Sequence, residues 1–217
     1  MITVDFVKKC IENADSLISK LPIEVSQYPG LSSQRVRHLI NNLCSFGDAK
    51  YLNIGLYSGS SYFSAIFNNS LKATGIDFWR NGLASKVDEI NFFKNLGEIL
   101  SKETETLDRE FNIINQDCFM VKLKDKYNVY FYDADHSYEG TYKSLAYFDK
   151  YLEDRFIFLM DDFDYPMIKE STNNSIADMG YKVEYRWEGI GDFGNWDVLT
   201  NNVWWNGLLV CLLEKNK

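Results

Sequence analysis

Short apolar runs alternate with amphipathic segments along most of the chain. Runs short enough for buried strands lie at 51–54, 72–77, 111–114, 128–132 and 156–160. Segments with the periodicity or length of helices lie between them, at 60–68, 83–109 and 140–152. Strands that alternate with helices predict an α/β fold, with a doubly wound, mostly parallel sheet covered by helices on both faces.

The two ends of the chain depart from this alternation. Residues 3–20 and 34–44 are predicted helices, the second of them capped by Ser32 or Ser33. Residues 1–48 are therefore expected to form an N-terminal helical cap on a core at 49–217, within a single domain. Near the other end, 181–187 and 204–213 are predicted strands with no helix between them, which favours antiparallel pairing.

Charge and cysteine content narrow the classes of partner. The formal net charge is -8, and no block of lysine or arginine is present, so a nucleic-acid or anionic membrane surface is not expected as the partner. The four cysteines stand far apart and indicate free thiols in a reducing compartment. The N-terminal residues lack the pattern of a signal peptide, and no apolar run has membrane-spanning length, so a cytoplasmic protein is expected.

Glycines follow the first predicted strand, in the sequence Asn53-Ile-Gly55-Leu-Tyr-Ser-Gly59. They allow a tight turn and the close approach of a ligand at a helix N-terminus, although an ordinary strand-to-helix turn uses glycine as well. Their spacing differs from the GxGxxG dinucleotide fingerprint. Asp77 ends the second strand, about 20 residues later, where an acid can bind the hydroxyl pair of a ribose. Residues 117–119 (Asp-Cys-Phe) end the third strand, and they either hold a purine ring or form a plain turn.

Acidic residues follow the fourth and fifth strands. Because these strands are expected to be neighbours, Asp133, Asp161 and Asp162 should converge, and carboxylates that converge favour a hard divalent ion such as Mg²⁺. The alternative is that some of them cap helices or face solvent. Asp135 and His136 are the candidate bases for removing a proton from a substrate, and His136 could equally be a structural donor to a carboxylate.

Two further features lie outside these motifs. His38 shares the predicted helix 34–44 with Arg35 and Arg37, where surface exposure or packing of the cap accounts for it. The segment 188–202 is long for a hairpin loop, and loops of that length are often functional. Within it, Trp196 is the candidate for a wall of a substrate site.

The order of these motifs resembles the class I S-adenosylmethionine-dependent methyltransferases, in the small-molecule branch described as methyltransferase domain 24. Residues 51–59 (Tyr-Leu-Asn-Ile-Gly-Leu-Tyr-Ser-Gly) are similar to the family's Leu-Glu-Ile-Gly-x-x-x-Gly loop. Residues 133–140 (Asp-Ala-Asp-His-Ser-Tyr-Glu-Gly) are similar to its Asp-Gly-Asp-His-Ser-Tyr-Glu signature. The resemblance spans about residues 33–213 and implies a Rossmann-like, seven-stranded sheet whose last strand is antiparallel.

The resemblance also implies roles for individual residues. The methionine part of the cofactor would lie among Gly55, Tyr57, Gly59 and Ser61. Asp77 would bind the ribose, Phe78 would lie beside the adenine, and Asp117 and Cys118 would line the adenine pocket. In related sugar O-methyltransferases that use Mg²⁺, the positions of Asp133, Asp161 and Asp162 bind the metal. Asp133 would also border the cofactor, and Asp135 would match the general base.

Asn53 departs from the family, which usually has Glu or Asp at this position. An amide can accept hydrogen bonds from the loop or cofactor, but it lacks the charge that favours a sulfonium. The resulting hypothesis is methyl transfer from S-adenosylmethionine to a hydroxyl of a small polar acceptor, a sugar, assisted by Mg²⁺. The alternatives are a nicotinamide-dependent oxidoreductase on a Rossmann sheet and a non-catalytic ligand-binding domain of the same fold. Homo-oligomerisation remains open at this point.

Overall fold

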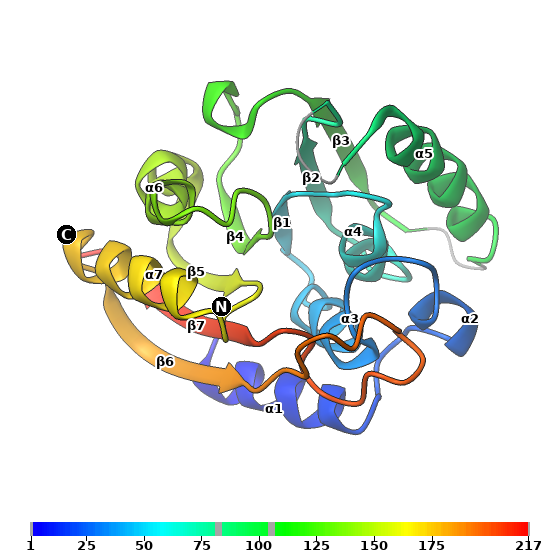
Figure 1. Ribbon diagram of the computed structural model, residues 1–217, viewed down its shortest axis with the longest axis horizontal. Helices are drawn as coiled ribbons and strands as arrows, with labels where there is room; N and C mark the ends of the chain where they lie inside the picture. The colour runs from blue at the N-terminus through cyan, green and yellow to red at the C-terminus, as the bar shows by residue number, and fades with distance from the viewer. Residues whose placement is uncertain (1, 81–83, 104–106, 217) are drawn as a thin grey trace.

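The computed structural model describes residues 2–80, 84–103 and 107–216 (Figure 1). Its helices are α1 (Val4–Asp15), α2 (Ile23–Ser26), α3 (Gln34–Leu43), α4 (Ser60–Ile66), α5 (Lys86–Leu100), α6 (Tyr138–Phe148) and α7 (Pro166–Asp178), with short 3₁₀ turns η1 (Cys118–Met120) and η2 (Asp149–Tyr151). Its strands are β1 (Lys50–Ile54), β2 (Lys72–Asp77), β3 (Glu110–Asn115), β4 (Tyr127–Tyr132), β5 (Leu152–Met160), β6 (Lys182–Gly189) and β7 (Leu208–Glu214).

The described strands form one seven-stranded sheet in the order β3-β2-β1-β4-β5-β7-β6. The pairs among β1 to β5 are parallel, whereas β7 is antiparallel to both β5 and β6. The predicted mostly parallel, seven-stranded sheet with an antiparallel last strand is thereby confirmed. Strand order runs outward from β1 on one side and from β4 on the other, so the topological switch point lies between these two strands.

Side chains that alternate along the central strands fill a separate core on each face of the sheet. Val129 and Phe131 of β4 join the core that includes buried residues of α1, α3, α4 and α5. Tyr130 and Tyr132 point to the other face and join buried residues of α6 and α7. Figure 1 shows α6 and α7 together on one side of the sheet and α1, α3 and α4 on the other. This arrangement confirms the doubly wound expectation.

The N-terminal helices are part of the first core. Apolar residues at helical spacing bury one face of α1 and one face of α3 against the sheet. Thr3 caps α1 by accepting a hydrogen bond from the Phe6 N–H at 3.1 Å. Of the two candidate caps of α3, Ser33 is the one used, and its Oγ accepts from the Val36 N–H at 3.4 Å.

Several boundaries differ from those predicted. The predicted helix 83–109 corresponds to α5, and residues 83 and 104–106 lie outside the described residues. The predicted helix 140–152 ends earlier than expected, as α6 at Phe148. The turn η2 follows, and strand β5 begins at Leu152. Strand β7 begins only at Leu208, because the residues before it form a turn in which Trp205 and Gly207 have positive φ angles. None of the described helices is both long and apolar enough to span a membrane.

Candidate active site

A cavity of about 830 Å³ lies at the carboxyl ends of β1, β2, β4 and β5, the edge at which doubly wound sheets bind ligands. Its volume is within the usual range of small-molecule sites. Thirteen of the predicted site residues line it: Gly55, Tyr57, Ser61, Asp77, Phe78, Asp117, Cys118, Asp133, Asp135, His136, Asp161, Asp162 and Trp196. Asn53 and Gly59 are not among the lining residues.

The glycine loop (residues 55–59) packs tightly against the end of β4. Gly55 has φ +87°, and a Cβ atom at this position would lie 1.6 Å from the carbonyl oxygen of Asp133. Its N–H donates to the Ile76 carbonyl at 2.9 Å, which fastens the loop to β2. Only glycine fits both the conformation and the space, so the backbone of the loop forms a wall of the cavity.

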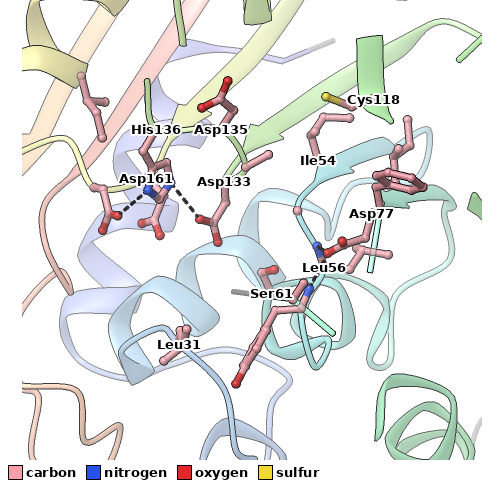
Figure 2. A pocket seen from close by; sticks show the side chains of 18 of the residues that line it. Leu31, Ile54, Leu56, Ser61, Asp77, Cys118, Asp133, Asp135, His136 and Asp161 are labelled. Atoms are coloured by element: carbon pink, nitrogen blue, oxygen red, sulfur yellow. Dashed lines mark hydrogen bonds and ion pairs between the residues drawn. The ribbon is translucent and has the colours of Figure 1, made fainter. Parts of the chain in front are cut away.

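Asp77 holds the other side of the glycine loop. Its Oδ2 accepts hydrogen bonds from the N–H groups of Leu56 at 2.7 Å and Tyr57 at 2.8 Å (Figure 2). Burial raises the pKa of Asp77 and the charge of Asp133 adds to this, while the backbone N–H groups act in the opposite direction. Trp79, which the sequence pattern did not single out, donates its Nε1–H to the Tyr57 carbonyl at 2.8 Å.

Asn53 supports the loop from behind. It is fully buried at the end of β1, and its Nδ2 donates to the Gly55 carbonyl at 3.0 Å. Its Oδ1 accepts from the Tyr51 hydroxyl at 3.2 Å and the Ser61 hydroxyl at 3.0 Å. The amide therefore both donates and accepts toward the protein, whereas a carboxylate here would direct an oxygen at the Gly55 carbonyl.

The residues after β3 contribute both polar and apolar side chains to the cavity. Asp117 caps the turn η1, where its Oδ1 accepts from the Phe119 N–H at 2.9 Å. Burial raises the pKa of the Cys118 thiol to about 12, with the charge of Asp117 adding to the effect, so this thiol stays protonated. Together with Phe78 and Phe119, Cys118 lines the cavity.

An acid–histidine cluster lies at the carboxyl ends of β4 and β5. It consists of Asp133, His136 and Asp161, which Figure 2 labels, together with Asp162. The His136 ring lies between two carboxylates, with Nδ1 at 3.1 Å from Asp162 Oδ2 and Nε2 at 3.6 Å from Asp133 Oδ1. Burial alone would lower the pKa of His136, but the carboxylates of Asp133 and Asp162 outweigh it and the pKa is raised. Burial, with the charges of Asp133 and Asp162, raises the pKa of Asp161 well above its usual range.

Asp133, Asp161 and Asp162 come together as predicted, but their arrangement does not form the predicted magnesium site. Among the described residues, no three His, Cys, Asp or Glu side chains are placed to hold a metal ion. The imidazole of His136 occupies the space between Asp133 and Asp162, where an ion shared by these acids would have to lie. A magnesium ion needs its ligand oxygens at about 2.0–2.1 Å in octahedral geometry, so the residues as arranged do not fit it.

The two candidate bases point in different directions. Both carboxylate oxygens of Asp135 accept hydrogen bonds from Ser137, one from its N–H and one from its hydroxyl, each at 2.9 Å. Figure 2 shows the Asp135 carboxylate directed away from Asp133 and Asp161. Asp135 thus orders the turn into α6, which Ser137 caps, while His136 faces the acids. Of the two candidate bases, His136 is the one that lies in the acid–histidine cluster.

Side chains form the cavity wall beside β5. We call this wall the rim: Tyr165, Met167, Trp196 and Trp205, all of which line the cavity. The Trp196 ring lies 6.2 Å from the Trp205 ring at 79°, and 55% of Trp196 is exposed. Beside the rim, Asn206 donates its Nδ2–H to Asp162 Oδ1 at 2.9 Å. Of the four rim residues, only Trp196 was predicted from the sequence. Gly207 is the sequence signal for the turn that places Trp205 and Asn206.

Asp164 lies shortly before α7 but does not cap this helix. The residue that precedes α7 is Tyr165, which makes no capping hydrogen bond through its side chain. Asp164 instead accepts from the Gly191 N–H at 2.6 Å, and the Asp164 N–H donates to the Asn206 carbonyl at 3.1 Å. These bonds tie the long segment before β7 to the end of β5, and this places the rim.

Comparison with family models finds no match, and none of the curated proteins matches the chain. Solved structures do match. An O-methyltransferase from Bacillus cereus in complex with SAH is 8% identical over 99% of this chain and 93% of its own, with a TM-score of 0.53. A putative SAM-dependent methyltransferase from Streptococcus mutans is 13% identical over 83% of this chain, with a TM-score of 0.55. At these identities the likeness shows a common fold.

The chain is shorter than some of these proteins. It spans about half (48%) of the Streptococcus mutans protein. It spans 61% of a cyclopropane synthase from Mycobacterium tuberculosis, which is 12% identical over 69% of this chain with a TM-score of 0.48.

Proposed function

We propose that the protein is an S-adenosylmethionine-dependent methyltransferase that acts on a hydroxyl of a small acceptor. The observation that carries this proposal is the bonding of Asp77 to the glycine loop. It places a carboxylate at the tip of β2 beside an open wall of backbone, in a cavity of ligand size. The shared fold with an O-methyltransferase solved with SAH supports the choice of cofactor.

The cofactor would extend along the tips of β1, β2 and β3. Asp77 uses Oδ2 for the loop, and its other oxygen would accept hydrogen bonds from the ribose. The adenine would lie against Phe78, Cys118 and Phe119, which offer flat or apolar surface without charge. The methionine part would reach the glycine loop and Ser61, where backbone groups at the start of α4 are available.

The acid–histidine cluster would remove the proton of the acceptor. S-adenosylmethionine supplies the methyl group, which passes from its sulfur to the acceptor oxygen. His136 would accept the hydroxyl proton, and the carboxylates of Asp133 and Asp162 on either side would stabilise the imidazolium that forms. Because these carboxylates raise the pKa of His136, the neutral imidazole that accepts the proton forms as pH rises through the raised value.

The acceptor would lie between His136 and the rim. Aromatic faces such as those of Trp196 and Trp205 pack against a ring, while Asn206 and Asp162 offer polar groups at one edge. These features suit a small ring compound that carries hydroxyl groups, and a sugar is the acceptor we expect. The negative charge of the chain is consistent with a small molecule rather than a nucleic acid.

The proposed reaction assigns no step to magnesium, because His136 lies between Asp133 and Asp162, two of the three acids expected to share the ion. We therefore expect EDTA to leave the rate of methyl transfer unchanged. The measurement is SAH formation in enzyme stripped with EDTA and then supplied with Mg²⁺. A rate that falls on stripping and returns with Mg²⁺ would mean that the cluster rearranges around an ion.

The nicotinamide alternative is less well supported. The reversed strand β7 lies between β5 and β6, whereas the dinucleotide-binding sheet has the order 3-2-1-4-5-6. The glycine spacing also differs from the dinucleotide fingerprint.

Calorimetric titration with SAH, S-adenosylmethionine and NADH tests the proposal. We expect the first two to bind and NADH not to bind. Asp77→Ala should weaken SAH binding by about 100-fold, since hydrogen bonds to a charged group contribute roughly 1.5–3 kcal/mol each. Asp48→Ala, an exposed acid before the amino end of β1, is the matched control. Binding of NADH alone, or equal SAH affinity in both variants, would refute the assignment. Binding without methyl transfer would leave a ligand-binding domain.

A further inference from the structure

The cap contains a buried cation that the proposed reaction does not use. Arg37 of α3 is 0% exposed, and burial lowers its pKa to about 9. In the described part of the chain no carboxylate forms an ion pair with it. Burying a charge costs free energy unless its hydrogen-bond donors are satisfied. The stability of the buried guanidinium therefore depends on its hydrogen bonds.

Within the described part of the chain, the hydrogen bonds of the Arg37 side chain all end on one short segment, the cap segment (residues 26–32). Nε donates to the Ser32 hydroxyl at 2.8 Å, and Nη2 donates to the Gly30 carbonyl at 3.1 Å. Nη1 donates to the Ser26 carbonyl at 3.1 Å and also to the Tyr28 carbonyl. A planar guanidinium with five N–H donors can hold several carbonyls in a fixed geometry, which an ammonium group cannot do. One side chain therefore fixes the path of the cap segment.

The cap segment is in turn pressed against the cavity. The Ser32 and Ser60 hydroxyls lie 3.2 Å apart, and a Cβ at Gly30 would come within 2.5 Å of the Ser60 side chain. Leu31 and Ser60 both line the cavity. Figure 2 shows Leu31 on the Ser61 side of the cavity, opposite Cys118. The cap segment thus closes the end of the cavity that lies beside the start of α4.

We propose that Arg37 is a positioning residue that shapes this end of the cavity, and that it thereby determines how tightly the amino-acid part of the cofactor is held. The inference rests on the proposed function, because it assigns one end of the same cavity to one part of S-adenosylmethionine. Arg37 acts through Leu31 and Ser60 rather than by touching the ligand. The nucleoside part, held at the tips of β2 and β3, lies beyond its influence.

Two probes separate the two ends of the cavity. SAH carries both the nucleoside and the amino-acid part, whereas 5′-methylthioadenosine carries the nucleoside and the sulfur without the amino acid. In Arg37→Met we expect SAH affinity to fall at least about tenfold, with the affinity for 5′-methylthioadenosine unchanged. Arg37→Lys should not restore SAH binding, because an ammonium cannot hold the same set of carbonyls.

A second variant and a control keep the test decisive. Gly30→Ala keeps the Arg37 side chain, but its Cβ would crowd Ser60 at 2.5 Å and Arg37 Nη2 at 3.3 Å and so displace the cap segment. It should reproduce the selective loss of SAH affinity even if Arg37→Met does not fold. Arg35→Met removes a neighbouring arginine of α3 that pairs instead with Asp15 at 3.2 Å, and both probes should bind it as they bind the wild type.

The outcomes that overturn the inference differ from the one that overturns the proposed function. Equal losses for SAH and 5′-methylthioadenosine in folded Gly30→Ala or Arg37→Met would show that Arg37 is only structural. Full SAH affinity in Arg37→Lys would show that the positive charge, and not the planar geometry of the guanidinium, holds the cap segment. Wild-type protein that binds neither probe would refute the methyltransferase proposal itself, and the inference with it.

Discussion

In the half of the cavity beside β1 and β2, the wall includes a glycine loop whose backbone is held by hydrogen bonds, whereas beside β5 the wall consists of the side chains of the rim. The glycine loop is fixed by hydrogen bonds to Asp77, Trp79 and the Ile76 carbonyl. The rim has exposed side chains, including 48% of Met167 and 39% of Tyr165. A backbone wall suits a ligand that never changes, and a side-chain wall can be altered for different acceptors without disturbing the fold.

The largest expected effect is on the rate of methyl transfer, and it should come from His136, which lies between the two halves of the cavity. His136→Gln should lower the rate of methyl transfer by roughly 10²–10⁴-fold, the usual contribution of a general base. SAH affinity should be unchanged, because the ring faces Asp133 and Asp162 and not the glycine loop. SAH formation with a panel of sugars and phenols measures the rate, with Glu139→Gln on the exposed face of α6 as the control. A parallel loss of rate and SAH affinity would contradict the separation.

Gly55→Ala should have the largest effect on the cofactor half. The new Cβ would collide with the Asp133 carbonyl, and the residue would be held at φ +87°. We expect SAH affinity to fall by about 100-fold, corresponding to about 3 kcal/mol of strain and displacement. Gly97→Ala in α5, where a Cβ meets nothing within 4 Å, is the matched control. Tight SAH binding by Gly55→Ala would mean that the backbone of the glycine loop does not contact the cofactor.

The cofactor half should also respond to pH. The pKa of Asp77 is raised above 3.8 by burial and by Asp133, against the effect of the backbone N–H groups. As pH falls through this raised value, Asp77 gains a proton and loses its charge-assisted hydrogen bonds. SAH affinity should therefore decline on acidification, by about tenfold once Asp77 is neutral. Calorimetry from about pH 8 to about pH 5 measures it, and Asp77→Asn should give a flatter profile. Equal slopes would assign the effect to another group.

Asn53→Asp tests whether the departure from the family weakens the loop. A carboxylate cannot donate to the Gly55 carbonyl, so the variant should lose about 1–3 kcal/mol of unfolding free energy. We expect SAH affinity to fall roughly fivefold, equal to about 1 kcal/mol transmitted through the loop. Asn69→Asp, equally buried but bonded to carbonyls of Asn41 and Ala65, is the control that should lose stability only. Tighter SAH binding by Asn53→Asp would refute this account.

The sequence predicted the residues at the strand ends better than it predicted the partners of their side chains. Hydrophobic periodicity locates the strands, and in a parallel sheet it therefore locates their tips; hence Gly55, Asp77 and Asp133 were expected together. The partners of a side chain depend on rotamers and on loop paths, which periodicity does not encode. That Asp135 would bond to Ser137 while His136 turned toward Asp162 could not be foreseen.

The rim and the cap show the same limit. Trp204 and Trp205 extend the apolar run of β7, so they were assigned to the strand; the positive φ of Trp205 instead makes a turn that brings this ring to the cavity. Arg37 lies on a helix among polar residues, where an exposed position is the usual expectation. Its burial depends on carbonyls of a segment without regular periodicity.

Trp196→Ala should have the narrowest effect, on acceptor binding alone, and it tests the rim directly. Because 55% of Trp196 is exposed, its removal should leave the melting temperature and SAH affinity unchanged. An aromatic contact with the acceptor contributes about 0.5–1.5 kcal/mol, so KM for the acceptor should rise roughly three- to tenfold at constant kcat. Phe193→Ala, also exposed and packed on Tyr165 but not lining the cavity, is the matched control. If kcat falls instead, Trp196 orients the reacting hydroxyl, and the rim takes part in the chemistry as well as in acceptor binding.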